Sequence, residues 1–186
     1  MNWHKKDDWT GYSWDERLFP YGGGEAIKPL KEKLNLKFGV NIHDDTGVGH
    51  WEDKYEEFAK AVGWDTSKNE TIPFLSCGDE RYAYALEDVV MKPLKEDDGV
   101  DFFWIDWQQG QGEGGCLGDD LNPRYNPTIQ LNKLRITDEI RNGGEDRSMI
   151  LSRWGGLGNH RYQVGFSGDV DQVQWDRLAY QPYFSR

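Results

Sequence analysis

The sequence lacks the features that mark membrane and secreted proteins. It has no run of 18 or more uncharged apolar residues, and its mean hydropathy is -0.85, which excludes a transmembrane helix. The N-terminal segment 1–8 has no apolar run after its charged residues, so as written it is not a secretory signal. We therefore expect no membrane association, and a cytoplasmic location if Met1 is the true start; the compartment is otherwise unknown.

Cysteine and basic residues are also scarce. The two cysteines, Cys77 and Cys116, have no CxxC pair or histidine-rich neighbourhood, and this pattern predicts buried or free thiols rather than a zinc site or a disulfide scaffold. The chain has 22 Lys and Arg residues against 33 Asp and Glu residues, a net charge of -11. Such a chain repels phosphate backbones, so we expect no nucleic-acid partner.

Aromatic residues, by contrast, are abundant. The chain has 9 Trp, 9 Tyr and 8 Phe, or 14% of its 186 residues, and large rings in this number can build a hydrophobic core. The length fits a single domain, 1–186. No internal repeat or low-complexity linker divides it.

The order of the apolar segments predicts an α/β fold. Apolar residues keep a helical spacing over 25–34, 51–62, 80–95 and 129–141, and 171–180 is a candidate for another helix. Short apolar or alternating segments predict strands near 37–42, 100–106, 148–152 and 163–167, with a glycine-rich loop over 108–125. Strands that alternate with helices favour parallel βαβ units.

Two aspartates follow predicted strands, where active sites of parallel α/β proteins collect. Asp106 ends a run of apolar and aromatic residues, and Asp169 lies in a glycine-flanked turn. Glycoside cleavage needs one ionised carboxylate at an oxocarbenium-like centre and one carboxyl that gives its proton to the leaving oxygen. A strand-terminal Asp is also consistent with a helix N-cap or a loop hydrogen-bond acceptor.

Other candidate residues have an ordinary structural interpretation beside the functional one. His43 stands next to Asp44 and Asp45 and is a candidate metal ligand, but the lack of further ligands at suitable spacing favours a hydrogen-bonded structural histidine. The tryptophans can stack on sugar rings or fill the core. The loop 110–118 lacks the Gly-Lys-Ser/Thr ending of a phosphate-binding loop.

Two long motifs resemble those of glycoside hydrolase family 31. Segment 101–110, Asp-Phe-Phe-Trp-Ile-Asp-Trp-Gln-Gln-Gly, resembles the nucleophile motif of the branch that carries Trp-Gln-Gln-Gly after the aspartate. Segment 151–169 resembles the acid/base region of the family, in which an arginine and the catalytic aspartate have the same sequence spacing as Arg153 and Asp169. Segments 9–14, 18–20, 41–43 and 71–74 agree with the family in the same order. The resemblance therefore covers nearly the whole chain.

The resemblance implies a retaining α-glycosidase on a TIM barrel. Asp106 would be the nucleophile that forms a covalent glycosyl-enzyme, and Asp169 would be the acid/base residue. Arg153 would hold sugar hydroxyls in the innermost subsite.

The remaining substrate-binding residues that the resemblance implies are Trp104, Trp107, His43 and Trp3. The implied partner is a carbohydrate, an α-glycoside, and no metal or organic cofactor is implied. Members of the Trp-Gln-Gln-Gly branch include enzymes that act on α-linked N-acetylgalactosamine. α-Glucosides, α-xylosides and α-galactosides remain open.

The matched segments cover only the central part of the family barrel. We expect four full strands plus a remnant at 2–4, where eight strands close a TIM barrel, so we expect a partial, open barrel. By the same resemblance, Asn2 occupies the position of an acidic residue of the family, so an aspartate that binds the substrate is absent or replaced.

Three hypotheses follow from the partial barrel. The chain is the catalytic core of an α-glycosidase whose flanking parts are lost, cut away or encoded elsewhere, or it is an inactive remnant that binds carbohydrate. The third hypothesis is a half-barrel that self-associates through its open edges.

Overall fold

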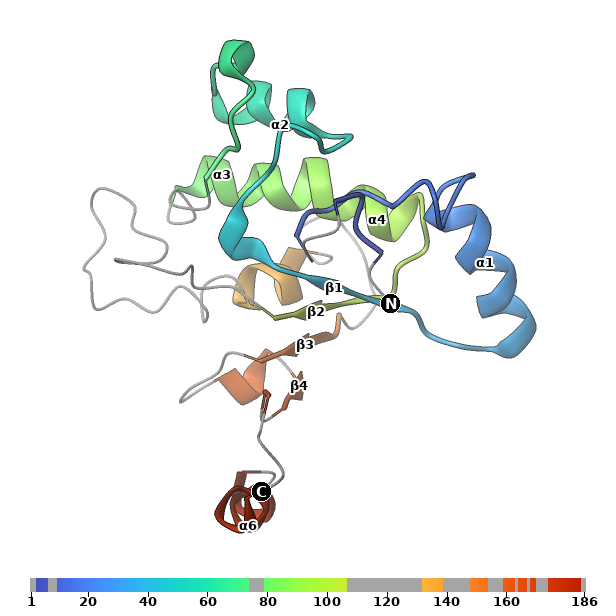
Figure 1. Cartoon of the computed structure of the whole chain (residues 1–186), viewed down its shortest axis with the longest axis vertical. Helices are drawn as coiled ribbons and strands as arrows, with labels where there is room; N and C mark the ends of the chain where they lie inside the picture. The colour runs from blue at the N-terminus through green and yellow to red at the C-terminus, as the bar shows by residue number, and fades with distance from the viewer. Residues whose placement is uncertain are drawn as a thin grey trace.

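A computed structural model describes residues 3–6, 10–73, 79–106, 132–138, 148–153, 159–162, 164–166, 168–169 and 174–184. Within these residues four short strands form one parallel sheet in the order β1-β2-β3-β4 (Figure 1). The strands are β1 (Gly39–Ile42), β2 (Phe102–Ile105), β3 (Ile150–Ser152) and β4 (Val164–Gly165). This arrangement confirms the predicted open, parallel part of a barrel.

Helices and 3-10 turns separate successive strands in the sequence, as the βαβ pattern predicts, and one helix precedes β1 and another follows β4. They are α1 (Gly23–Leu34), the 3-10 turn η1 (Asp44–Thr46), α2 (Tyr55–Val62), the 3-10 turn η2 (Thr66–Lys68), α3 (Glu80–Ala85), the π-helix η4 (Leu86–Met91), α4 (Lys92–Glu96), a helix over 132–138, the 3-10 turn η5 (Asn159–Arg161) and α6 (Trp175–Phe184).

Several predicted boundaries differ from the structure. The helix expected from residue 51 begins at Tyr55, because residues 51–54 form turns in which the Glu52 carboxylate accepts the Tyr12 backbone N–H at 3.0 Å. The single helix expected over 80–95 contains the π-helix η4 between α3 and α4. The helix expected over 171–180 begins at Trp175 and extends to Phe184.

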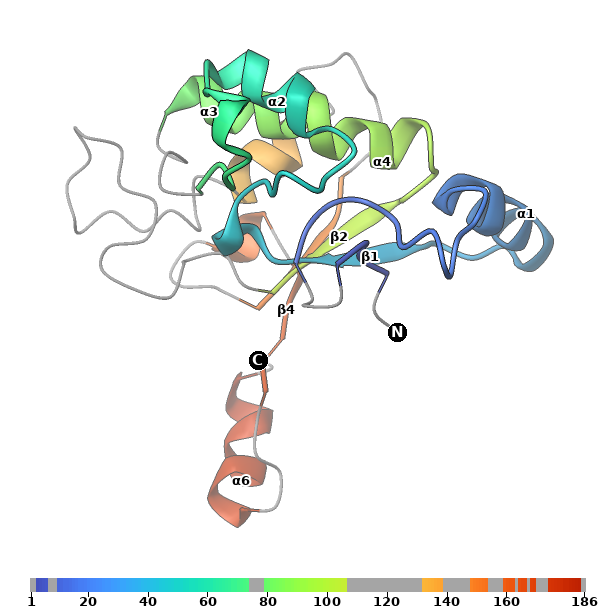
Figure 2. The same cartoon turned by 45° about the horizontal axis from the view of Figure 1, so that its top comes forward.

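The strands alternate between two environments. Val40 and Ile42 of β1, Phe103 and Ile105 of β2, and Ile150 of β3 are buried, and α2, α3 and α4 lie on one side of the sheet (Figures 1 and 2). The intervening residues point to the other face because successive strand side chains alternate. In a barrel that other face is the interior.

The helices cover the sheet with large apolar side chains. Phe58 of α2 and Tyr82 of α3 are fully buried and pack edge to face, with their ring centroids 5.2 Å apart. Leu86 and Met91 of η4 join the same core. Leu30 and Leu34 of α1, in contrast, are exposed although they share the helical spacing of the buried Ile27.

The remnant expected at 2–4 differs from a barrel strand. His4 forms an isolated antiparallel bridge with Trp14, and the backbone N–H of Asp15 donates to the Trp3 carbonyl at 2.8 Å. The indole Nε1 of Trp3 donates to the backbone carbonyl of Asn41 at 2.7 Å. The segment therefore lies against β1 through a side chain and does not extend the parallel sheet within the described residues.

The far edge of the sheet is open in the described part of the chain. There β4 pairs with β3 alone, and its Val164 is 52% exposed. Helix α6 stands away from the sheet beyond β4 (Figure 2) and exposes Trp175, Tyr180 and Tyr183. None of the described helices has the length and apolar character needed to span a membrane.

Candidate active site

The sheet carries Asp106 and Arg153 to neighbouring positions at its carboxyl edge. The backbone N–H of Asp106 donates to the Ile42 carbonyl, and that of Arg153 donates to the Ile105 carbonyl, each at 3.0 Å. Both residues thus continue the ladder one position beyond their strands. By alternation from Trp104 and Leu151, their side chains lie on the face opposite the helices.

Arg153 brings together the two aspartates that were predicted to be catalytic. Its Nη1 lies 3.0 Å from Oδ1 of Asp106, and its Nη2 lies 3.2 Å from Oδ2 of Asp169. The two carboxyl groups have different surroundings: the Asp106 side chain is 16% exposed and the Asp169 side chain is 90% exposed. One guanidinium therefore links a fixed carboxylate and a solvent-facing one.

His43 lies on the other side of Asp106. It follows β1, and its Nε2 is 3.4 Å from Oδ2 of Asp106, without hydrogen-bond geometry. Asp106 is thus placed between an imidazole and a guanidinium, each of which faces a different carboxylate oxygen.

Gly168 has a backbone conformation and a location that both require glycine. Its φ is +72°, in the region that side chains disfavour, and a Cβ there would lie 2.9 Å from Nε of Arg153. The absence of a side chain lets the chain pass over Arg153 and place Asp169 beside Nη2.

The face that carries Asp106 also has buried polar atoms with no hydrogen-bond partner. Asn41 and Trp104 are opposite each other in the register of β1 and β2. Among the described residues, the amide Nδ2 and Oδ1 of Asn41 and the indole Nε1 of Trp104 have no hydrogen-bond partner. Buried polar atoms are usually paired, so these three atoms are suited to bind groups of a ligand. The Trp104 ring packs edge to face with Phe166, with centroids 5.9 Å apart.

Trp3 and Trp107 are the remaining residues that were expected to bind the substrate. Trp3 is buried, packs against Trp14 at a centroid distance of 4.7 Å and uses its N–H on Asn41, so its predicted contact with sugar stays a prediction. Trp107, Cys77 and Cys116 lie outside the described residues.

His43 and the neighbouring Asp44 face different partners. The structure places His43 against Asp106, whereas the carboxylate of Asp44 binds Arg135. Among the described residues no group of three or more His, Cys, Asp and Glu side chains is arranged to hold a metal ion.

Comparison with protein-family models matches residues 1–184 to the TIM-barrel domain of the glycosyl hydrolases family 31. The chain belongs to glycosyl hydrolase family 31. Comparison with curated proteins gives no match. The family 31 domain supports a glycosidase activity in general and a carbohydrate as the substrate, and the parallel sheet agrees with a part of its barrel.

Sequence reasoning missed a buried ionic cluster, which we call the Arg135 cluster: Tyr12, Asp44, Glu87 and Arg135. Arg135 donates from Nη1 and Nη2 to the two oxygens of Asp44, at 2.7 and 3.0 Å, and from Nε to Glu87 at 3.0 Å. The Tyr12 hydroxyl donates to Asp44 at 2.9 Å. Two features of the sequence could have indicated the cluster: a charged residue, Arg135, in the predicted helix 129–141, and another, Glu87, beside the apolar Leu86.

Burial dominates the protonation of this cluster. It raises the pKa of Glu87 to about 7; Arg135 opposes that rise, and Asp138 and Asp44 add to it. Burial would lower the pKa of Arg135, but Asp44 and Glu87 raise it above the usual value. One guanidinium thus faces two carboxyl groups in a place shielded from solvent, and Glu87, which accepts one of the three contacts, changes its charge near neutral pH.

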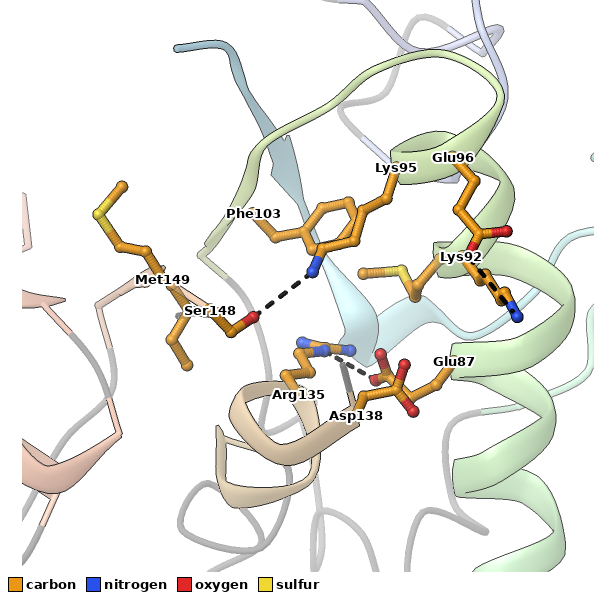
Figure 3. Close-up of a pocket in the computed structure, with 11 residues that line it drawn as sticks. Glu87, Lys92, Lys95, Glu96, Phe103, Arg135, Asp138, Ser148 and Met149 are labelled. Carbon is orange, nitrogen blue, oxygen red and sulfur yellow. Dashed lines mark hydrogen bonds and ion pairs between the residues drawn. The ribbon is translucent and has the colours of Figure 1, made fainter. Parts of the chain in front are cut away.

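A cavity of about 150 Å³ lies next to the Arg135 cluster (Figure 3). Phe103 and Ile150, which face the helices, line it, so it lies on the side of the sheet away from Asp106. Figure 3 shows Arg135 bonded to Glu87, with Asp138 beside them. This cavity is therefore separate from the candidate active site.

Proposed function

We propose that this family 31 domain hydrolyses α-glycosidic bonds with retention of configuration. Asp106 is the proposed nucleophile and Asp169 the proposed acid/base residue. The observation that supports this most is the guanidinium of Arg153, which contacts both carboxyl groups at 3.0 and 3.2 Å. The two aspartates are thus close enough to act on one glycosidic bond.

The surroundings of the two aspartates suit two different tasks. Asp106 is largely shielded and is held between Arg153 and His43, and a fixed carboxylate is what attack on an anomeric carbon requires. Asp169 faces solvent over most of its surface, so it can exchange protons with water between the two steps.

In the proposed first step, a carboxylate oxygen of Asp106 forms a bond to the anomeric carbon. The bond from that carbon to the leaving oxygen breaks, and Asp169 gives its proton to this oxygen. In the second step, Asp169 takes a proton from water, the water oxygen bonds to the anomeric carbon, and the bond to Asp106 breaks. The product keeps its α configuration because each step inverts the carbon.

For the substrate we propose an α-linked sugar, with N-acetylgalactosamine as the first candidate and glucose or galactose as the others. The motif Trp107-Gln108-Gln109-Gly110 supports the first candidate by its resemblance to that branch. The unpartnered polar atoms of Asn41 and Trp104 support a ligand that offers hydroxyl or amide groups to the open face of the sheet.

Turnover of 4-nitrophenyl α-glycosides of these sugars tests the proposal. We expect release of nitrophenol by the unchanged chain and a loss of at least about 10³-fold in Asp106→Asn. The matched control is the same substitution at an exposed position, Asp97→Asn, which should retain full activity. Equal rates in Asp106→Asn and the unchanged chain would contradict the role of Asp106.

Azide rescue then separates the two roles. With Asp106→Ala, azide attacks the sugar directly, and we expect a β-glycosyl azide. With Asp169→Ala, azide attacks the glycosyl-enzyme, and we expect an α-glycosyl azide. The same anomer from both variants would contradict the assignment.

One observation favours a second candidate, a half-barrel that self-associates. In the described part of the chain the β4 edge is open, and Trp175 of α6 is 84% exposed. Exposed strand edges and large apolar side chains promote association. Light scattering tests this. An average molar mass that rises from that of the monomer to that of the dimer as the protein concentration increases supports self-association, and a constant monomer mass contradicts it.

A further inference from the structure

The Arg135 cluster lies directly behind the candidate active site. His43 and Asp44 are adjacent in the chain, and each faces a different side of the sheet. The imidazole of His43 is 3.4 Å from Asp106, whereas the carboxylate of Asp44 binds Arg135. Because neighbouring residues share one peptide unit, the orientation of the Asp44 side chain constrains the direction of His43.

Two segments far apart in the chain hold the carboxylate of Asp44. Both oxygens accept from the fork of Arg135, and one also accepts from the Tyr12 hydroxyl. Two parallel N–H donors fix the plane of a carboxylate as well as its distance. The side chains of Asp44 and Arg135 are 0% and 1% exposed, so water does not compete for these bonds.

Arg135 is itself held by a second carboxyl group. Its Nε donates to Glu87, which lies in the π-helix η4. The guanidinium therefore joins three parts of the fold: the helix 132–138, η4 and the turn η1 that follows β1. In its own right a buried ion pair is weak evidence for stability, because removing charges from water is costly. Its defined geometry is the more informative property.

We propose that Arg135, together with Tyr12, is a positioning residue for the active site. It clamps Asp44 on the helix side of the sheet and so holds the imidazole of His43 against Asp106 on the other side. Its effect on turnover rests on the function proposed above, but its effect on the orientation of His43 does not.

The orientation is tested by NMR on the whole chain with labelled histidine. The chain has 4 histidines, and a His43→Gln variant assigns the His43 signals. Arg135→Lys keeps the charge but lacks the fork, and Tyr12→Phe removes one hydroxyl. We expect the ring signals of His43 to shift in both variants, more in Arg135→Lys, while those of His50 and His160 stay unchanged.

The matched control is Arg81→Lys. Arg81 is exposed on α3 and lies 3.8 Å from Asp79, so this variant should leave all histidine signals unchanged. A merely structural role of Arg135 would lower the unfolding midpoint but leave the His43 signals of the folded protein in place. Unchanged His43 signals in folded Arg135→Lys would overturn the proposal.

Kinetics provide a second readout on a 4-nitrophenyl α-glycoside that the unchanged chain cleaves. We expect kcat to fall about 10- to 100-fold in Arg135→Lys with KM nearly unchanged, because a small displacement near the reacting atoms lowers the rate. An unchanged kcat would contradict the proposal. If the unchanged chain cleaves none of the glycosides, the proposed function fails, and the NMR result alone decides the positioning role.

Loss of folding in Arg135→Lys does not block the test. Tyr12→Phe introduces no charge change and leaves both Arg135 bonds to Asp44, so it should fold. A His43 shift in this variant supports the clamp, and its absence overturns it.

Discussion

The guanidinium of Arg153 and the carboxylate of Asp106 are 3.0 Å apart, although the two residues follow different strands. Parallel pairing produces this contact: Ile105 is opposite Ser152 in the register, and the next residue of each strand is Asp106 or Arg153. The ladder thus places a cation beside the proposed nucleophile without any long loop. Asp169 completes the arrangement from beyond β4.

Replacing Arg153 by lysine should reduce activity strongly. A lysine amine is a single point donor, so it can replace the contact with Asp106 or with Asp169 but not the planar link between them. We expect Arg153→Lys to lower kcat/KM on the aryl α-glycoside about 10²-fold. Arg161→Lys, at an exposed position of η5, is the matched control. Equal kcat/KM in the two variants would contradict a role for the bridging geometry.

A methyl group at residue 168 should disturb the same site from the backbone. Gly168 has a positive φ, and a Cβ would approach Arg153 Nε to 2.9 Å. We expect Gly168→Ala to displace Arg153 and to reduce kcat/KM about tenfold or more. Gly22→Ala is the control, because φ is also positive there but a Cβ would meet nothing within 4 Å. If both variants keep full activity, the close approach at Gly168 has no functional role.

The polar edge of Trp104 should contribute to ligand binding. Trp104→Phe removes the buried indole N–H, which has no hydrogen-bond partner in the described part of the chain, and keeps an aromatic ring near Phe166. We expect weaker binding of the sugar, with KM raised about fivefold to tenfold for one lost hydrogen bond, and little loss of stability. Trp175→Phe on α6 should leave KM unchanged. A KM that stays constant in Trp104→Phe would show that this N–H does not contact the sugar.

The sequence allowed the sheet and the strand-end residues to be predicted because both depend on local pattern. The apolar run before Asp106 predicts β2, and the parallel βαβ order then brings Asp106 and Arg153 to one edge. The Arg135 cluster could not be predicted in this way, because its members are far apart in the chain and meet only through tertiary packing. The same limit applies to Leu30 and Leu34, whose helical spacing indicates a face but not a partner to cover it.

The Arg135 cluster should make the stability of the chain depend on pH near neutrality. Burial raises the pKa of Glu87 from 4.5 to about 7. When folding raises the pKa of a carboxyl group, its stabilising contribution is fully present at pH values below the pKa that the group has in the unfolded chain. The contribution is lost as the pH rises through the pKa of the group in the folded protein. The free energy of unfolding should therefore fall between about pH 5 and pH 8, by up to about 3 kcal/mol for a shift of this size.

Glu87→Gln should remove most of this dependence, since glutamine keeps an oxygen that can accept from Arg135 Nε but cannot ionise. Urea unfolding at pH 5 and pH 8 is the measurement, and at pH 8 we expect the variant to be more stable than the unchanged chain. Glu96→Gln, an exposed position in α4, is the control and should retain the full pH dependence. If the free energy of unfolding changes by the same amount between pH 5 and pH 8 in Glu87→Gln and in the unchanged chain, Glu87 is not the group responsible for the pH dependence.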